Sequence, residues 1–78
     1  MTHQEALLAV SYLAMTESDD IRFVALYDPK QREHRPELLA ECERLDAVSQ
    51  QAHCDAGIAE GDDGPWRRVV GWFEGDKL

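Results

Sequence analysis

The sequence predicts an all-α fold, a small bundle of about four helices in a single domain over residues 1–78. Three observations support this prediction. Residues 1–15 are rich in alanine and leucine, and residues 36–59 repeat apolar side chains at helical spacing. Prolines and glycines gather mainly at 28–36 and 57–65, where they would separate helices. A chain this short lies near the lower limit for an independent core, so self-association is also expected.

The first predicted helix begins at Thr2, which stands three residues before Glu5 in the spacing of a capping box. Between residues 6 and 15 only Ser11 is strictly polar. We therefore expect this helix to be buried over most of its circumference, or to present one face to another subunit.

A second, short helix is expected over residues 21–27. Ser18 is an N-cap candidate, and Asp19 and Asp20 suit the positive end of a helix dipole. The same seven residues include aromatic and β-branched side chains, so a buried strand is the alternative.

The next break falls between Asp28 and Pro36. Its short basic stretch is predicted to be a loop. Asp28 as N-cap and Pro29 at the first helical position would start one helical turn within it.

A long amphipathic helix is predicted from Glu37 to about Ala59. Its core positions alternate by four and three residues and shrink from leucine to alanine: Leu38, Cys42, Leu45, Ser49, Ala52, Ala56 and Ala59. Because Cys42 lies on this stripe, we interpret it as a small core residue.

The C-terminal segment 66–73 is predicted to form a further helix, because Trp66, Val69, Val70 and Phe73 would share one face. Gly75 would then end it. As a strand, the segment has no cleanly apolar face. The alternative fold is α+β, with Ile21–Tyr27 and Val69–Phe73 as two short strands.

The charge balance restricts the partners that this chain can bind. Eight basic residues face sixteen acidic ones, a formal net charge of −8. Nucleic-acid backbones and anionic membranes would repel such a chain, whereas basic protein surfaces would attract it. The apolar run at 6–14 follows Glu5 and is too short for a membrane span. We expect a cytoplasmic protein that binds neither nucleic acid nor membrane directly.

Residue types that carry chemistry do not form a recognisable motif. Cys42 and Cys54 would stand roughly 18 Å apart on one helix, too far for a disulfide, so reduced thiols are expected. His53 and Cys54 are adjacent and would point about 100° apart, which disfavours a shared metal ion. We therefore predict no enzyme activity, no metal and no cofactor.

The candidate residues for partner binding are acidic or aromatic. An acidic helix face is usually just solvated, and aromatic residues at helical spacing usually complete a core. Trp72 stands opposite the apolar face of the tail, and Arg68 lies one turn before it, where a cation–π pair is one option. The predicted partner-binding residues are Glu41, Glu43, Asp46, Asp62, Asp63, Arg68 and Trp72.

These features favour a small, acidic, non-enzymatic protein that regulates or inhibits another protein, most naturally a nucleic-acid-handling protein with a basic surface. In composition it resembles the inhibitors that bacteriophages make against host defence or transcription machinery. The alternative is an assembly module, either a helical homo-oligomer such as a homodimer or a subunit of a larger complex. Its interface would combine the first helix with the Trp-bearing tail.

Overall fold

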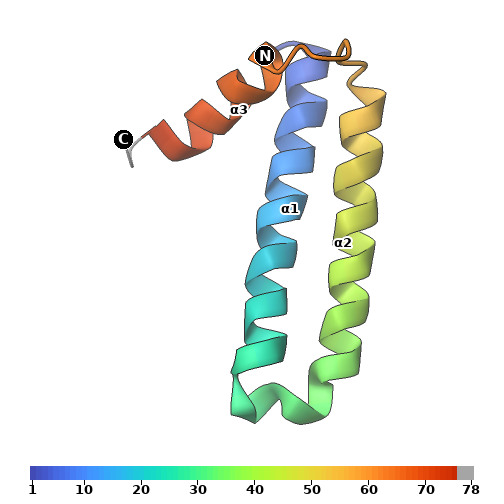
Figure 1. The fold of residues 1–78 in the computed structure, drawn as a ribbon, viewed down its shortest axis with the longest axis vertical. Coiled ribbons are helices and arrows are strands. Elements are labelled where there is room, and N and C mark those ends of the chain that lie inside the picture. The colour runs from blue at the N-terminus through green and yellow to red at the C-terminus, as the bar shows by residue number, and fades with distance from the viewer. Residues whose placement is uncertain (76–78) are drawn as a thin grey trace.

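The computed structural model describes residues 1–75, which form three α-helices and one 3₁₀ helix (Figure 1). In chain order these are α1 (His3–Tyr27), η1 (Pro29–His34), α2 (Arg35–Asp55) and α3 (Gly64–Glu74). Helices α1 and α2 form an antiparallel hairpin, and α3 lies obliquely beside the N-terminal end of α1 (Figure 1). The described residues contain no strand. The all-α prediction is therefore confirmed, and the α+β alternative is wrong.

The first two expected helices are one continuous helix, so the expected count of about four is wrong. The start of α1 is as predicted. The backbone N–H of Glu5 donates to Thr2 Oγ1, and the N–H of Thr2 donates to Glu5 Oε1. Ser18 does not begin a second helix, because no glycine or proline interrupts residues 3–27. The helix ends at Asp28, whose extended backbone is the conformation favoured before a proline.

The hairpin turn is also close to the prediction. Asp28 accepts a hydrogen bond from the N–H of Lys30 at 2.9 Å, and Pro29 opens η1. Helix α2 then begins two residues before the predicted start and ends four residues before the predicted end. It ends early because Gly57 adopts a φ of 66°, the left-handed conformation that commonly stops helices.

Helix α1 packs on α2 through small side chains. The inward residues of α1 alternate by three and four positions, and four of them are buried: Ser11, Ala14, Ser18 and Ala25. They face small buried residues of α2, including Cys42 and Ala52. At this contact Ser49 donates to the carbonyl of Ser11 at 2.8 Å. Of residues 6–15, seven are buried or half-buried, and the exposed ones are Val10, Leu13 and Met15. The expected burial of this segment over most of its circumference is therefore met except at these three side chains.

Helix α3 packs on the N-terminal part of α1, on the side opposite α2 (Figure 1). Leu8, Ala56 and Val69 form a buried cluster, and Trp66 packs against it. Phe73 stacks on Tyr12 with ring centroids 4.8 Å apart and an angle of 9° between the ring planes. These contacts confirm the predicted helical face of the tail.

Candidate functional site

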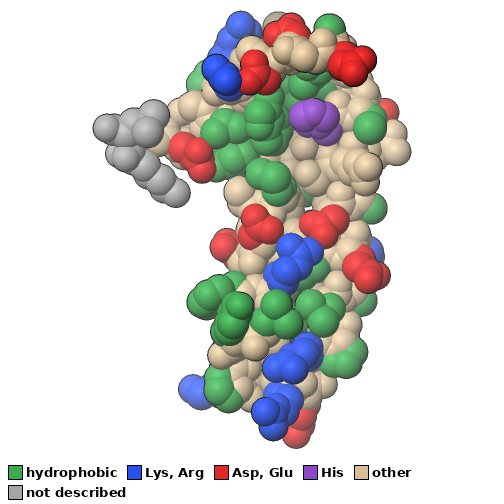
Figure 2. Space-filling view, in the orientation of Figure 1, with side chains coloured by type: hydrophobic (Ala, Val, Ile, Leu, Met, Phe, Trp, Pro, Cys, Tyr) green, Lys and Arg blue, Asp and Glu red, His purple; other side chains and the backbone are tan. Residues whose placement is uncertain are grey.

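In residues 1–75 no group of three or more His, Cys, Asp or Glu side chains is arranged to hold a metal ion. Within the same range, none of the helices is long and apolar enough to cross a membrane. Two surface regions combine apolar side chains with carboxylates: one face of α1, and a hollow at the turn that connects α2 to α3. Figure 2 shows hydrophobic side chains exposed at several places along the hairpin.

The first region is a stripe on α1 that lies outside the packed contact with α2 and borders α2 near Leu38. We call it the outward stripe; it alternates by four and three positions and consists of Ala6, Val10, Leu13, Glu17, Asp20, Val24 and Tyr27. Its large apolar side chains are 46% (Val10), 51% (Leu13), 39% (Val24) and 70% (Tyr27) exposed. These side chains stay at least 39% exposed, although Val24 lines a hollow together with Leu38 of α2. Alternation by four and three positions is the spacing of a helix–helix contact. Helix α1 therefore has two faces with this spacing, and α2 packs only on the inward one.

The middle of the outward stripe is acidic. Glu17 and Asp20 are exposed, and neither takes part in an ion pair among the described residues. They line a hollow of about 290 Å³ together with the apolar side chains of Ile21, Val24 and Leu38. An apolar floor with carboxylates beside it suits a basic side chain, whose methylene groups pack while its charged end meets the acids.

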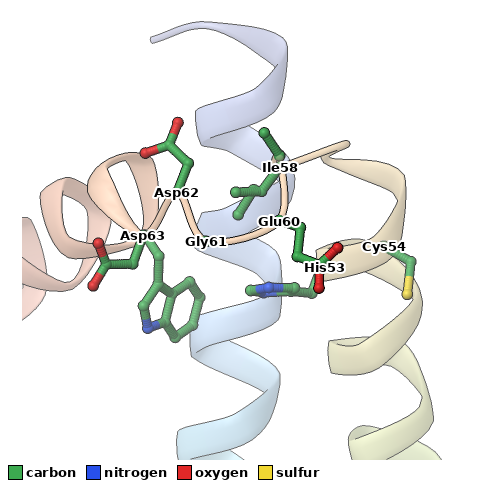
Figure 3. A pocket seen from close by; sticks show the side chains of 9 residues that line it. His53, Cys54, Ile58, Glu60, Gly61, Asp62 and Asp63 are labelled. Carbon is green, nitrogen blue, oxygen red and sulfur yellow. The ribbon is translucent and has the colours of Figure 1, made fainter.

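The second region, the turn hollow, measures about 630 Å³ and is shown in Figure 3. Its lining comes from the end of α2, the connecting turn and the start of α3, and includes His53, Cys54, Ile58, Glu60, Asp62, Asp63 and Trp66. The rings of His53 and Trp66 meet edge to face, with centroids 5.3 Å apart. In Figure 3 the thiol of Cys54 points away from this ring pair, so the two neighbours do not form a Cys–His dyad.

Two predicted binding residues, Asp62 and Asp63, lie in this turn, but both already have internal partners. Asp62 Oδ1 accepts from the N–H of Gly64 at 3.2 Å, and Asp63 Oδ2 lies 2.8 Å from Nε of Arg67. Figure 3 shows both carboxylates pointing away from His53. The hollow is therefore lined mainly by the ring pair of His53 and Trp66, together with Ile58 and Glu60. Such a combination binds apolar or cationic groups.

The structure does not bring the three predicted acids of α2 together. Residues two positions apart on a helix do not share a face, which separates Glu41 from Glu43. Glu41 pairs with Arg44. Asp46 accepts from Ser18 at 2.6 Å and from Arg22 at 2.7 Å. These two donors hold the pKa of Asp46 below its ordinary value, with the hydroxyl of Ser18 as the larger cause.

The two predicted residues of the tail have different surroundings. Arg68 Nη1 lies 3.8 Å from Oε2 of Glu5, so its nearest charge partner is the capping residue of α1. The pKa of Glu5 is lowered, first by the hydrogen bond from the backbone of Thr2 and to a smaller extent by Arg68. Trp72 is 48% exposed, as expected for a contact residue.

The outward stripe is not among the surfaces predicted from the sequence, although its periodicity is visible there. Alternation by four and three positions runs unbroken from Ala6 to Tyr27. Two features hid it: residues 6–15 are apolar in nearly every direction, and residues 21–27 were assigned to a separate element. Because residues 3–27 form one continuous helix, the apolar residues before and after Glu17 belong to a single stripe.

The described residues form a small helical hairpin with a third helix packed on the N-terminal part of α1 and an exposed, partly apolar stripe on α1. No family model matches the chain, and comparison with curated proteins and with solved structures gives no match. Its function is therefore inferred from the chemistry of its own surfaces.

Proposed function

We propose that this chain is a non-catalytic protein-binding module, which regulates or inhibits a partner that presents basic residues. The observation that carries the proposal is the outward stripe, where large apolar side chains of α1 stay exposed although the hairpin is otherwise packed. Burying apolar surface stabilises a contact by about 25 cal/mol per Å². Large exposed apolar side chains that share one helix face, beside charged residues, are typical of an interaction site.

The charge of the chain supports a basic partner. With a net charge of −8, the protein attracts basic surfaces over a distance and repels other acidic molecules. Proteins that handle nucleic acids present basic surfaces for the phosphate backbone, which makes them the most natural class of target. The free thiols of Cys42 and Cys54 fit a reducing compartment such as the cytoplasm.

A second candidate is an assembly module that pairs with copies of itself. The observation in its favour is that aromatic residues outside the stripe are also exposed: Phe23 on α1, and Trp72 and Phe73 on α3. Small chains commonly complete their cores by association. This candidate predicts a mass above that of the monomer at micromolar concentration, and a return to monomer on Trp72→Ala.

The test is a comparison of full-length variants as bait. We would immobilise the wild-type chain, Leu13→Asp and Val48→Asp, pass lysate over each, and elute with a salt gradient. Leu13 lies in the stripe, whereas Val48 is equally exposed but on α2, so it is the matched control. We expect one basic protein that wild type and Val48→Asp retain and Leu13→Asp loses. Identical capture by all three baits would contradict the proposed function.

A further inference from the structure

We propose that the outward stripe binds a single amphipathic helix of another protein, apolar at both ends of its contact face and carrying Lys or Arg at the centre. This inference rests on the proposed function and names its partner's chemistry. The stripe extends from Ala6 to Tyr27, about 32 Å along α1. Its alternation by four and three positions matches the side-chain spacing of a second helix, not of an extended strand.

The position of the acids defines the centre of the partner's face. Val10 and Leu13 precede Glu17 and Asp20, and Val24 and Tyr27 follow them, so apolar contacts flank a charged middle. The hollow beside Glu17 and Asp20 has an apolar floor made by Ile21 and Leu38. A partner lysine or arginine would lay its methylene groups on this floor and place its charge between the two carboxylates.

No cation of the described chain takes this place. Arg22, the nearest basic residue along α1, is bound to Asp19 at 3.3 Å and to Asp46 at 2.7 Å, on the side of α1 that faces α2. Glu17 and Asp20 are exposed and outside every ion pair of residues 1–75. Among residues 1–75 no cation is paired with these two acids, so the place is open to a cation from a partner.

A second copy of this chain is a poor occupant, because either symmetric pairing brings like charges together. In a parallel pair, Glu17 faces Glu17 and Asp20 faces Asp20. In an antiparallel pair that overlaps Val10 with Tyr27, Glu17 faces Asp20 of the other copy. Like charges at such positions disfavour the wrong pairing, which is a common source of specificity in helix–helix contacts. The acids thus favour a different, basic helix over self-association along this stripe.

The experiment uses the full chain and two designed helical peptides of about 21 residues, a length that matches the stripe. One peptide has leucine at its outer contact positions and lysine at the two central ones; the other has glutamate at the centre. Fluorescence anisotropy gives the two dissociation constants. We expect the lysine peptide to bind at least tenfold more tightly than the glutamate peptide.

Two double variants test whether the central acids set this preference. Glu17→Lys with Asp20→Lys should reverse the preference between the peptides. Glu33→Lys with Asp55→Lys, at exposed sites outside the stripe, changes the net charge equally and should leave the order of the peptides unchanged. Circular dichroism checks that each variant keeps its helices.

The inference is overturned if neither peptide binds, if both bind equally, if the first double variant does not reverse the preference, or if both double variants change it alike. A homodimer that Leu13→Asp disrupts would also overturn it. These results differ from a failure of the proposed function. If wild type captures a partner that Leu13→Asp loses, but the lysine and glutamate peptides bind equally, the proposed function stands. In that case the inference that the partner carries a basic helix is wrong.

Discussion

The buried hydroxyl of Ser18 donates to Oδ1 of Asp46 at 2.6 Å, across the contact between α1 and α2. The same carboxylate accepts from Nη2 of Arg22 through its other oxygen, and Sγ of Cys42 donates to the carbonyl of Ser18 at 3.3 Å. These bonds lie near the middle of the hairpin, among side chains too small to fix the register of the helices by shape alone. The polar contacts therefore set how α1 and α2 align.

Replacing Ser18 with alanine should destabilise the fold by about 1 to 2 kcal/mol, because a buried hydrogen-bond network loses its central hydroxyl. Urea denaturation followed by circular dichroism measures the change. Thr16→Ala is the matched control, since the hydroxyl of Thr16 bonds only to the nearby carbonyl of Leu13. Equal effects of the two substitutions would show that Ser18 adds nothing beyond local helix structure.

Stability should fall in acid partly because of Asp46. Its pKa is lowered in the folded state, so the stability that it contributes is present above its unfolded value, near pH 4, and is lost as the pH drops through the folded value. Asp46→Asn should therefore be less stable than wild type at pH 7, and its stability should change less between pH 5 and pH 2. Urea midpoints across this range measure the difference. Parallel pH profiles would contradict the role of this carboxylate.

The position of α3 should depend on Tyr12. Its ring stacks on Phe73, and its hydroxyl donates to Glu74 at 2.9 Å. Tyr12→Phe should keep the stacking and cause only a small loss of protection against amide hydrogen exchange in α3. Tyr12→Ala should expose those amides to rapid exchange. Phe23→Ala removes an exposed ring of the same helix and should leave α3 protected, so equal loss in both alanine variants would disprove the docking role of Tyr12.

Two glycines should respond to alanine with opposite signs. Gly57 has a φ of 66°, where a side chain costs about 1 to 2 kcal/mol, so Gly57→Ala should lower the melting temperature. Gly71 lies inside α3 with open space around the position of a Cβ atom. Gly71→Ala should raise the melting temperature, because alanine is favoured over glycine in a helix by up to about 1 kcal/mol. A change of the same sign in both would refute this distinction.

The two thiols should differ in reactivity. Cys54 is exposed, whereas Cys42 is buried and bonded to α1. Under native conditions a thiol reagent should modify Cys54 rapidly and Cys42 only after unfolding. Mass spectrometry after brief labelling distinguishes the sites. Rapid labelling of Cys42 would indicate that the hairpin opens far more often than its packing suggests.

Much of the local structure follows from the sequence alone. Thr2 and Glu5 specify the start of α1, Asp28 and Pro29 specify its end, and the stripe that includes Cys42 specifies the inward face of α2. These features act over a few residues, through capping, backbone restriction and helical periodicity, so they are present before any tertiary contact forms.

Only the tertiary structure decided which face of α1 turns inward. Two faces of α1 have the spacing of a helix–helix contact, and the one that carries the larger apolar residues, Val10 and Leu13, is favoured by its sequence pattern. The structure instead buries Ser11, Ala14 and Ser18, because α2 offers small side chains and matching hydrogen bonds that let the helices approach closely. That choice leaves Val10 and Leu13 outside and draws Asp46 into the hairpin. The binding surface thus depends on how two helices fit together, which neither helix specifies by itself.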